Sequence, residues 1–174
     1  NKCCYQLYCK KSLTGYPQPL YNACMLPMHT CPQCGATWPG SLTCQDAFHQ
    51  MLYWENEVPA LGQVHHLTVL CYHFQHPNLY SPQGLRYAVR LLRDFIEGDV
   101  TPQQARVRNR ARVDSHRRAW KITAAPASYG GYLNPVHWKL TAADVIASGA
   151  ENYCAAVQQW AQSIHSDLKT SANL

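Results

Sequence analysis

The sequence contains no long hydrophobic run. None of its stretches approaches the roughly 20 consecutive apolar residues that a helix needs to cross a bilayer. The first residues also lack a basic segment followed by an apolar run and a small-residue cleavage site, which is the pattern of a secretory signal. These two absences predict a protein that is neither membrane-embedded nor exported, and we expect a cytoplasmic location.

Several enzyme signatures are absent too. The chain has no H-E-x-x-H, no H-x-E with P-C-x-x-C, no G-x-S-x-G and no phosphate-binding loop.

Acidic residues are few: the chain has 10 Asp and Glu and 15 Lys and Arg, which gives a formal net charge of +5. Much of the excess lies between Arg106 and Lys121, where seven Lys or Arg accompany the single acid Asp114. This predicts a local basic face on a protein that is not basic overall.

Cysteine, in contrast, is plentiful. The nine cysteines are an odd number in a chain without a visible export signal, so reduced thiols fit better than a disulfide framework. With 174 residues, 47% of them hydrophobic, the chain can bury one sizeable core. We expect residues 1–30 to be an extension whose order the sequence leaves open, and residues 31–174 to form a single helical domain.

Apolar periodicity predicts two helices at the start of this domain. Residues 44–57 carry apolar side chains at three- and four-residue steps, and Pro59 follows them. A second pattern covers residues 64–76, where Pro77 disfavours helical geometry just before it. Because a short loop joins them, the two helices should pack as an antiparallel hairpin.

Two further helix starts follow. Ser81 precedes Pro82 as an N-cap, and Gly98 ends that helix. Thr101 and Gln104 have the spacing of a capping box and open the arginine-rich segment. Residues 119–140 are rich in Pro and Gly and should be irregular. The fold class we predict is mainly α, in a small helical domain.

A last helix is predicted near the C-terminus. Thr141 and Asp144 mark its N-cap, and apolar residues keep helical spacing from Val145 to Leu168.

The segment Cys31-Pro32-Gln33-Cys34-Gly35 predicts one half of a metal site. A two-residue spacer lets both thiolates approach one ion, and zinc prefers four tetrahedral Cys and His ligands. Cys44 and a cluster of other donors could complete the site: His65, His66, Cys71, His73 and His76.

Geometry narrows these candidates. Ligand atoms around one zinc lie only about 3 to 4 Å apart, whereas His65 and His76 are separated by roughly 16 Å of helix rise. In an antiparallel hairpin Cys44 lies beside His76, and His65 lies at the far end near Glu55 or Glu57.

The preferred ligand set is therefore Cys31, Cys34, Cys44 and His76. With these ligands, residues 31–174 form a single zinc-binding helical domain, in which an N-terminal zinc knuckle packs on the helical hairpin. His73, one helical turn from His76, is the first substitute, and His65 would serve if the knuckle folded to the opposite end. The alternative to a metal site is that Cys31 and Cys34 are ordinary free thiols. We expect an exposed imidazole at His66, and buried small side chains at Cys71 and Cys154.

The residues also resemble a known family. The shared features are Cys31-Pro32-Gln33-Cys34-Gly35-Ala36, Cys44 and Phe48, His65, Leu67-Thr68-Val69, Tyr72, Gln75-His76-Pro77, Leu140-Thr141-Ala142-Ala143-Asp144-Val145 and Trp160-Ala161. They resemble the uncharacterised bacterial family called domain of unknown function 5946, over roughly residues 31–168. The resemblance gives weight to Cys44, His65 and His76, and implies no reaction. The chain departs from the family at Leu70, where an acid is common, and at Gln45, where Trp is frequent.

Three functions are compatible with these features. The first is a binding or interaction module with a structural zinc ion and an unknown protein partner, since four protein ligands leave no position for water. The second is a metal-dependent, hydrolase-like enzyme that uses His65 with Glu55 or Glu57.

The third function is nucleic-acid binding through the basic segment: Arg106, Arg108, Arg110, Arg112, Arg117 and Arg118. We do not favour it, because alternating arginines on a helix do not all face one side. Salt bridges to Asp94, Glu97 or Asp99 would explain the same residues.

Overall fold

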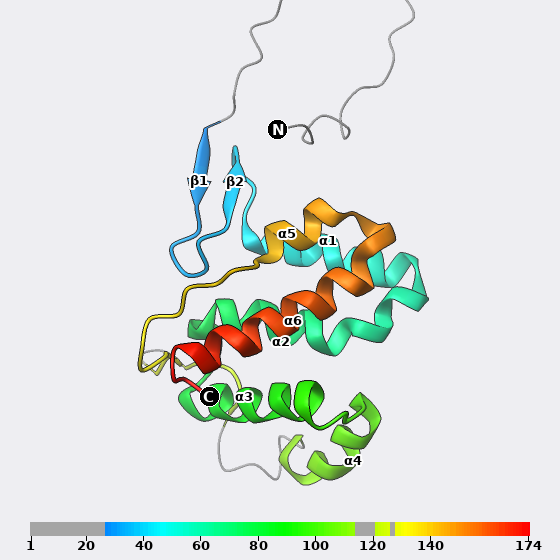
Figure 1. Cartoon of the computed structure of the whole chain (residues 1–174), viewed down its shortest axis with the longest axis vertical. Coiled ribbons are helices and arrows are strands. Elements are labelled where there is room, and N and C mark those ends of the chain that lie inside the picture. The colour runs from blue at the N-terminus through cyan, green and yellow to red at the C-terminus, as the bar shows by residue number, and fades with distance from the viewer. Residues whose placement is uncertain (1–26, 114–120, 126–127) are drawn as a thin grey trace, which may run out of the picture.

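The computed structural model describes residues 27–113, 121–125 and 128–174. Within these ranges it contains a small two-stranded sheet and six α-helices, and Figure 1 shows the sheet projecting from one end of the helical body. The prediction of a mainly α fold is therefore confirmed. None of the helices in the described ranges is long and apolar enough to cross a membrane.

Helices α1 (Cys44–Glu57) and α2 (His65–Gln75) form the predicted hairpin, joined by the 3-10 turn η1 (Pro59–Val64). Thr43 begins α1 with a capping box: its side chain accepts a hydrogen bond from the Asp46 amide, and the Asp46 carboxylate accepts one from the Thr43 amide. A 3-10 turn, η2 (Pro77–Leu79), follows α2 and redirects the chain. Cys44 and Gln75 therefore lie near the same end of the hairpin.

Helices α3 (Pro82–Glu97) and α4 (Pro102–Val113) start at the predicted N-caps. Ser81 Oγ accepts from the Gly84 amide, and Thr101 Oγ1 accepts from the Gln104 amide. The chain after α4 returns along the start of α3, where Ser81 Oγ donates to the Lys121 carbonyl. The segments described between 121 and 140 contain only isolated bridges, consistent with the predicted irregular connection.

The prediction of one continuous C-terminal helix is wrong. The structure has α5 (Ala142–Ser148), a 3-10 turn η3 (Ala150–Asn152) and then α6 (Tyr153–Thr170). Gly149 separates them with φ of +77° and ψ of 167°, a conformation that is essentially restricted to glycine. The break lets α5 pack against α1 while α6 packs against α2 (Figure 1).

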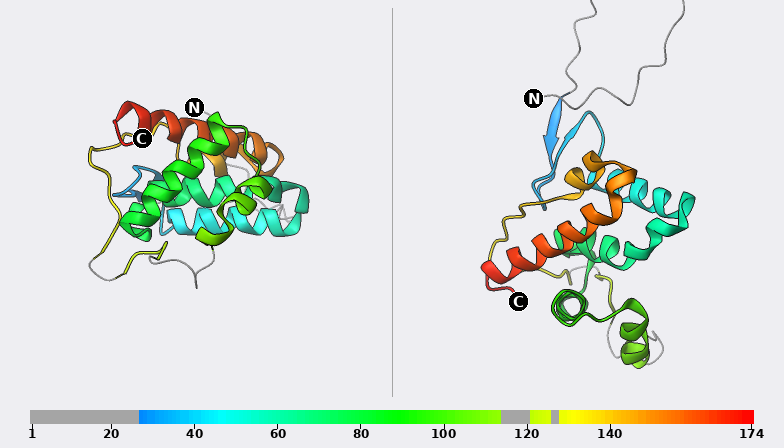
Figure 2. Two further views of the ribbon diagram at one scale, coloured as in Figure 1. Left: turned by 90° about the horizontal axis from the view of Figure 1, so that it is seen from below. Right: turned by 45° about the vertical axis from the view of Figure 1, so that its right-hand side comes forward.

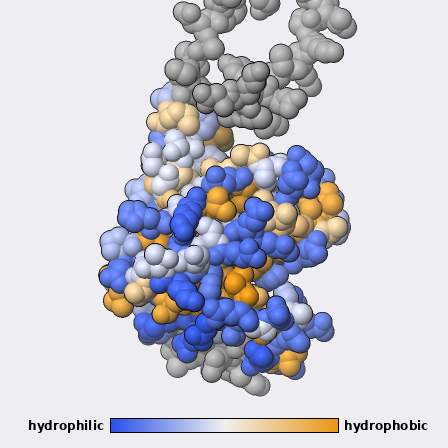
Figure 3. Space-filling view, viewed as in Figure 1, coloured by the Kyte–Doolittle hydropathy of each residue, from blue (hydrophilic) through white to orange (hydrophobic). Residues whose placement is uncertain are grey.

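The centre of the core is α6, which contacts α2, α3 and α5. The right-hand view of Figure 2 shows α6, coloured orange to red, between α5 and α3. Its Tyr153, Trp160 and Ile164 are fully buried, together with Phe74 of α2 and Leu92 of α3. On the face shown in Figure 3, most of the described residues are hydrophilic, as expected for helices that turn their apolar stripes inward. The hairpin of α1 and α2 therefore packs against α5 and the buried helix α6.

Candidate metal centre

The first two candidate ligands lie in the turn of a β-hairpin. Strands β1 (Met28–Thr30) and β2 (Thr37–Pro39) pair antiparallel, so the hairpin includes three residues that the sequence assigned to the extension. In the turn, the Cys31 amide donates to the Ala36 carbonyl at 2.8 Å, and the Gly35 amide donates to the Cys31 carbonyl at 2.9 Å. Gly35 has φ of +77°, which a residue with a Cβ rarely adopts. This turn places both cysteines on one side of the loop.

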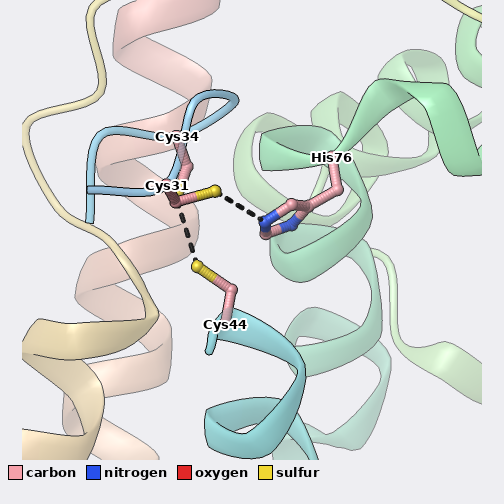
Figure 4. Close-up of side chains that lie close together, drawn as sticks. All are labelled: Cys31, Cys34, Cys44 and His76. Atoms are coloured by element: carbon pink, nitrogen blue, oxygen red, sulfur yellow. Dashed lines mark hydrogen bonds between the residues drawn. The ribbon is translucent and has the colours of Figure 1, made fainter. Parts of the chain in front are cut away.

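The other two candidate ligands come from the helical hairpin. Cys44 is the first residue of α1, and His76 is the residue that ends α2. Because these helices are antiparallel, both positions face the β-hairpin turn, and Figure 4 shows all four side chains converging.

The four ligand atoms lie within 4.8 Å of one another. Cys34 Sγ is 3.5 Å from Cys44 Sγ, and Cys31 Sγ is 3.7 Å from His76 Nε2. These distances match the spacing of about 3 to 4 Å between donors that share one tetrahedral ion. The cluster of three cysteines and one histidine could therefore hold a metal ion.

Neighbouring groups orient these donors. The Nδ1–H of His76 donates to the Tyr72 carbonyl at 2.7 Å, which leaves Nε2 with its lone pair toward the sulfurs. The indole Nε1–H of Trp38 donates to Cys44 Sγ at 3.2 Å. The Tyr72 ring lies 4.5 Å from the His76 ring and stacks on Phe48 at 4.2 Å between ring centroids. The histidine is thus fixed in the tautomer that suits metal binding.

The electrostatics of the cluster favour a charged sulfur at Cys44 and a protonated one at Cys34. The hydrogen bond between the two side chains, the largest cause in both cases, raises the pKa of Cys34 and lowers the pKa of Cys44. Burial by itself lowers the pKa of His76, but the nearby sulfurs of Cys44 and Cys31 and the Tyr72 carbonyl raise it above its usual value. A bound cation would stabilise all three sulfurs as thiolates.

The substitute ligands lie elsewhere. His73 Nδ1 donates to the Val69 carbonyl at 2.7 Å, and its ring packs near Tyr80. His65 is at the far end of the hairpin, where it pairs with Glu55 rather than Glu57. The cluster around Cys31 is the metal-ligand group found in the described ranges, and it contains neither of these histidines.

Two expectations for other residues need correction. His66 is half-buried and not exposed, because its ring packs edge-on against Phe95 at 4.7 Å between centroids. Cys71 is fully buried as expected, whereas Cys154 is only partly buried. The N-terminal cysteines Cys3, Cys4, Cys9 and Cys24 lie outside the described residues.

Half of the arginine cluster can be placed. Arg106, Arg108 and Arg110 are exposed on α4, and Arg108 lies 3.9 Å from Asp94, one of the acids proposed as a local partner. The side chains of Arg112, Arg117 and Arg118 lie outside the described residues. Nucleic-acid binding through this segment stays a prediction.

Sequence reasoning missed the groups that support the site. Trp38 lies only four residues after Cys34, so its proximity was readable from the sequence, but its bond to Cys44 depends on the twist of the hairpin. Tyr72 carried a signal as well, one helical turn before His76.

The comparisons with known proteins complete this description. No curated protein and no solved structure matches the chain. The chain does match the family described as "Family of unknown function (DUF5946)" over residues 29–169. This range includes all four candidate ligands and the six described helices, apart from Thr170 at the end of α6. This chain is therefore a member of the DUF5946 family.

Proposed function

We propose that the cluster of Cys31, Cys34, Cys44 and His76 binds one zinc ion and that the ion is structural. The observation that carries this proposal is the convergence of four ligand atoms within 4.8 Å from three separate elements of the fold. Three thiolates and one imidazole form a tetrahedral donor set that suits zinc. Four protein ligands leave no open position at which the ion could activate water.

The role of the ion is to fix the β-hairpin on the helical body. Apart from the cysteines, the hairpin contributes few buried side chains, chiefly Ala36 and Trp38, while every residue of β1 is exposed. Apolar burial on this scale holds a short hairpin weakly, since an isolated two-stranded hairpin is marginal in water. A zinc ion would link Cys31 and Cys34 to Cys44 at the start of α1 and to His76 at the end of α2.

The proposed biological role is a non-catalytic interaction module with a protein partner. Support comes from the exposed hairpin, where Met28 is 60% exposed on a strand with no neighbour on its outer edge in the described ranges. The zinc ion would hold the β-hairpin, which projects from the helices (Figure 1), in a fixed position for such a partner.

Elemental analysis of protein purified without added metal tests the zinc site. The parent chain should contain one zinc per molecule, and Cys31→Ser should lose it, while Cys154→Ser, a cysteine outside the cluster, should keep it. A reduced parent chain without zinc, or a Cys31→Ser variant that retains one equivalent, would overturn the proposal.

A further inference from the structure

A groove lies at the end of the helical hairpin remote from the cysteine cluster. It has a volume of about 650 Å³, and the polar residues around it are Glu55, Asn56, Gln63, His65, His66 and Arg106. Cavities of this size hold small organic molecules. The residues come from α1, the turn η1, the start of α2 and the start of α4.

A buried carboxylate lies at the base of this groove. The Glu55 side chain is only 6% exposed, and three donors surround it. Its Oε1 accepts from the Tyr153 hydroxyl at 2.6 Å and lies 2.9 Å from Thr68 Oγ1, and its Oε2 accepts from His65 Nδ1 at 2.5 Å. Burial first, and then the bond to Glu55, raise the pKa of Tyr153, so this phenol remains a donor. The core therefore fixes the carboxylate in position.

The carboxylate in turn fixes His65. The imidazole is 56% exposed and uses Nδ1–H for Glu55, so Nε2 on the opposite edge of the ring is left to contact a ligand. A histidine ring that a buried partner holds in place offers this second nitrogen in a defined orientation.

Charge in the groove favours an anion. Glu55 is the one acid among the lining residues, and its charge is already directed at His65. Burial, His65 and Arg106 lower the pKa of His66, which favours its neutral form. The Arg106 guanidinium forms no ion pair with the other residues that the structure describes, and its planar donors suit a carboxylate or a phosphate.

We propose that this groove is a binding site for a small hydroxylated anion, such as a sugar phosphate or a hydroxy acid. Arg106 binds the acidic group, and Nε2 of His65, whose ring is oriented by Glu55, forms a hydrogen bond with a hydroxyl. The amides of Asn56 and Gln63 are available for further polar groups. This site is independent of the zinc cluster, which lies at the other end of α1 and α2.

Nuclear magnetic resonance of the histidine ring nitrogens in the full, zinc-loaded chain tests the proposal with three probes. Glycerol 3-phosphate carries both features, inorganic phosphate only the anion, and glycerol only hydroxyls. We expect glycerol 3-phosphate to shift the His65 Nε2 signal saturably, phosphate to bind more weakly by on the order of tenfold, and glycerol to have no effect.

Variants locate the site. Arg106→Gln should weaken glycerol 3-phosphate binding by on the order of tenfold or more, whereas Arg110→Gln, an exposed arginine one turn further along α4, should leave it unchanged. Glu55→Gln should alter the tautomer signal of His65 and reduce the preference for glycerol 3-phosphate over phosphate, which a merely structural carboxylate would not do.

The exposed Arg106 can be replaced without disturbing the core, so this variant decides the outcome even if Glu55→Gln fails to fold. Absence of a saturable shift with glycerol 3-phosphate, or equal binding by the parent and Arg106→Gln, would overturn the proposal.

Discussion

Replacement of Cys44 by serine removes a single ligand atom from the proposed zinc site. Serine keeps the size of the side chain and its place at the start of α1, where Thr43 supplies the cap. A neutral hydroxyl is a poor zinc ligand, and it would also face the Trp38 indole in place of a sulfur. The variant should therefore lose the ion while it keeps the helical body.

The size of the effect follows from the chain that the site encloses. Cys31 and His76 are 45 residues apart, and a cross-link that closes a loop of this length stabilises a protein by about 4 kcal/mol in the chain-entropy treatment. An ion present at one hundred times its dissociation constant stabilises the folded state by about 2.7 kcal/mol. If the variant loses a stabilisation of about 2.7 to 4 kcal/mol, the Tm of a domain of this size should fall by roughly 5 to 16 °C.

Thermal unfolding followed by circular dichroism measures this change. The parent in excess chelator should fall to the Tm of Cys44→Ser, and the variant itself should not respond to chelator. Cys154→Ser should behave as the parent does in both conditions. If Cys44→Ser unfolds with the parent, and chelator leaves the parent unchanged, the ion does not hold the hairpin and our reasoning is refuted.

Three other predictions concern the cluster and the core. Zinc affinity should fall as pH falls, because the proton on Cys34, whose pKa is raised, must leave when the metal binds, and so must a proton on His76, whose pKa is raised as well. Zinc titrations by calorimetry at several pH values measure this change, and an affinity that stays the same at all of them would contradict it. Gly149→Ala should lower the free energy of unfolding by about 1 to 3 kcal/mol in denaturant titrations, because φ of +77° is strained for alanine. Gly131→Ala should have little effect, because a Cβ at this position would meet no atom within 4 Å. Equal losses in the two variants would refute the explanation of the helix break. Tyr153→Phe should cost about 1.5 to 3 kcal/mol by removing a buried donor from a carboxylate, and an unchanged stability would mean that Glu55 does not depend on it.

The sequence predicted the helix starts well because their signals are local. Ser81, Thr101 and Thr141 each carry an oxygen that caps an amide two or three residues later, so neither a distant contact nor a tertiary constraint was needed to find them. The break at Gly149 was missed because the apolar period continues across it from Val145 to Tyr153. Periodicity records which residues are buried, and both sides of the break are buried against the same core.

The four clustered donors were predictable because two geometric rules acted together. A C-x-x-C turn fixes one pair, and an antiparallel hairpin brings the start of one helix beside the end of the next, which selected His76 over His65. The β-hairpin itself was not predicted, since strands of three residues are too short to show alternation.

The surroundings of Glu55 could be predicted only in part. Its pairing with His65 follows from the hairpin, because both residues lie at the same end of α1 and α2. Tyr153 is 98 residues away along the chain, and its bond to Glu55 exists because Gly149 turns α6 back across the hairpin. No local pattern records such a contact.

X-ray absorption at the zinc edge of the purified chain tests the central claim most directly. A structural site formed by Cys31, Cys34, Cys44 and His76 predicts four-coordinate zinc with three sulfur neighbours at about 2.3 Å and one nitrogen at about 2.0 to 2.1 Å. A spectrum with fewer than three sulfurs, or with an oxygen from water in the first shell, would contradict the account.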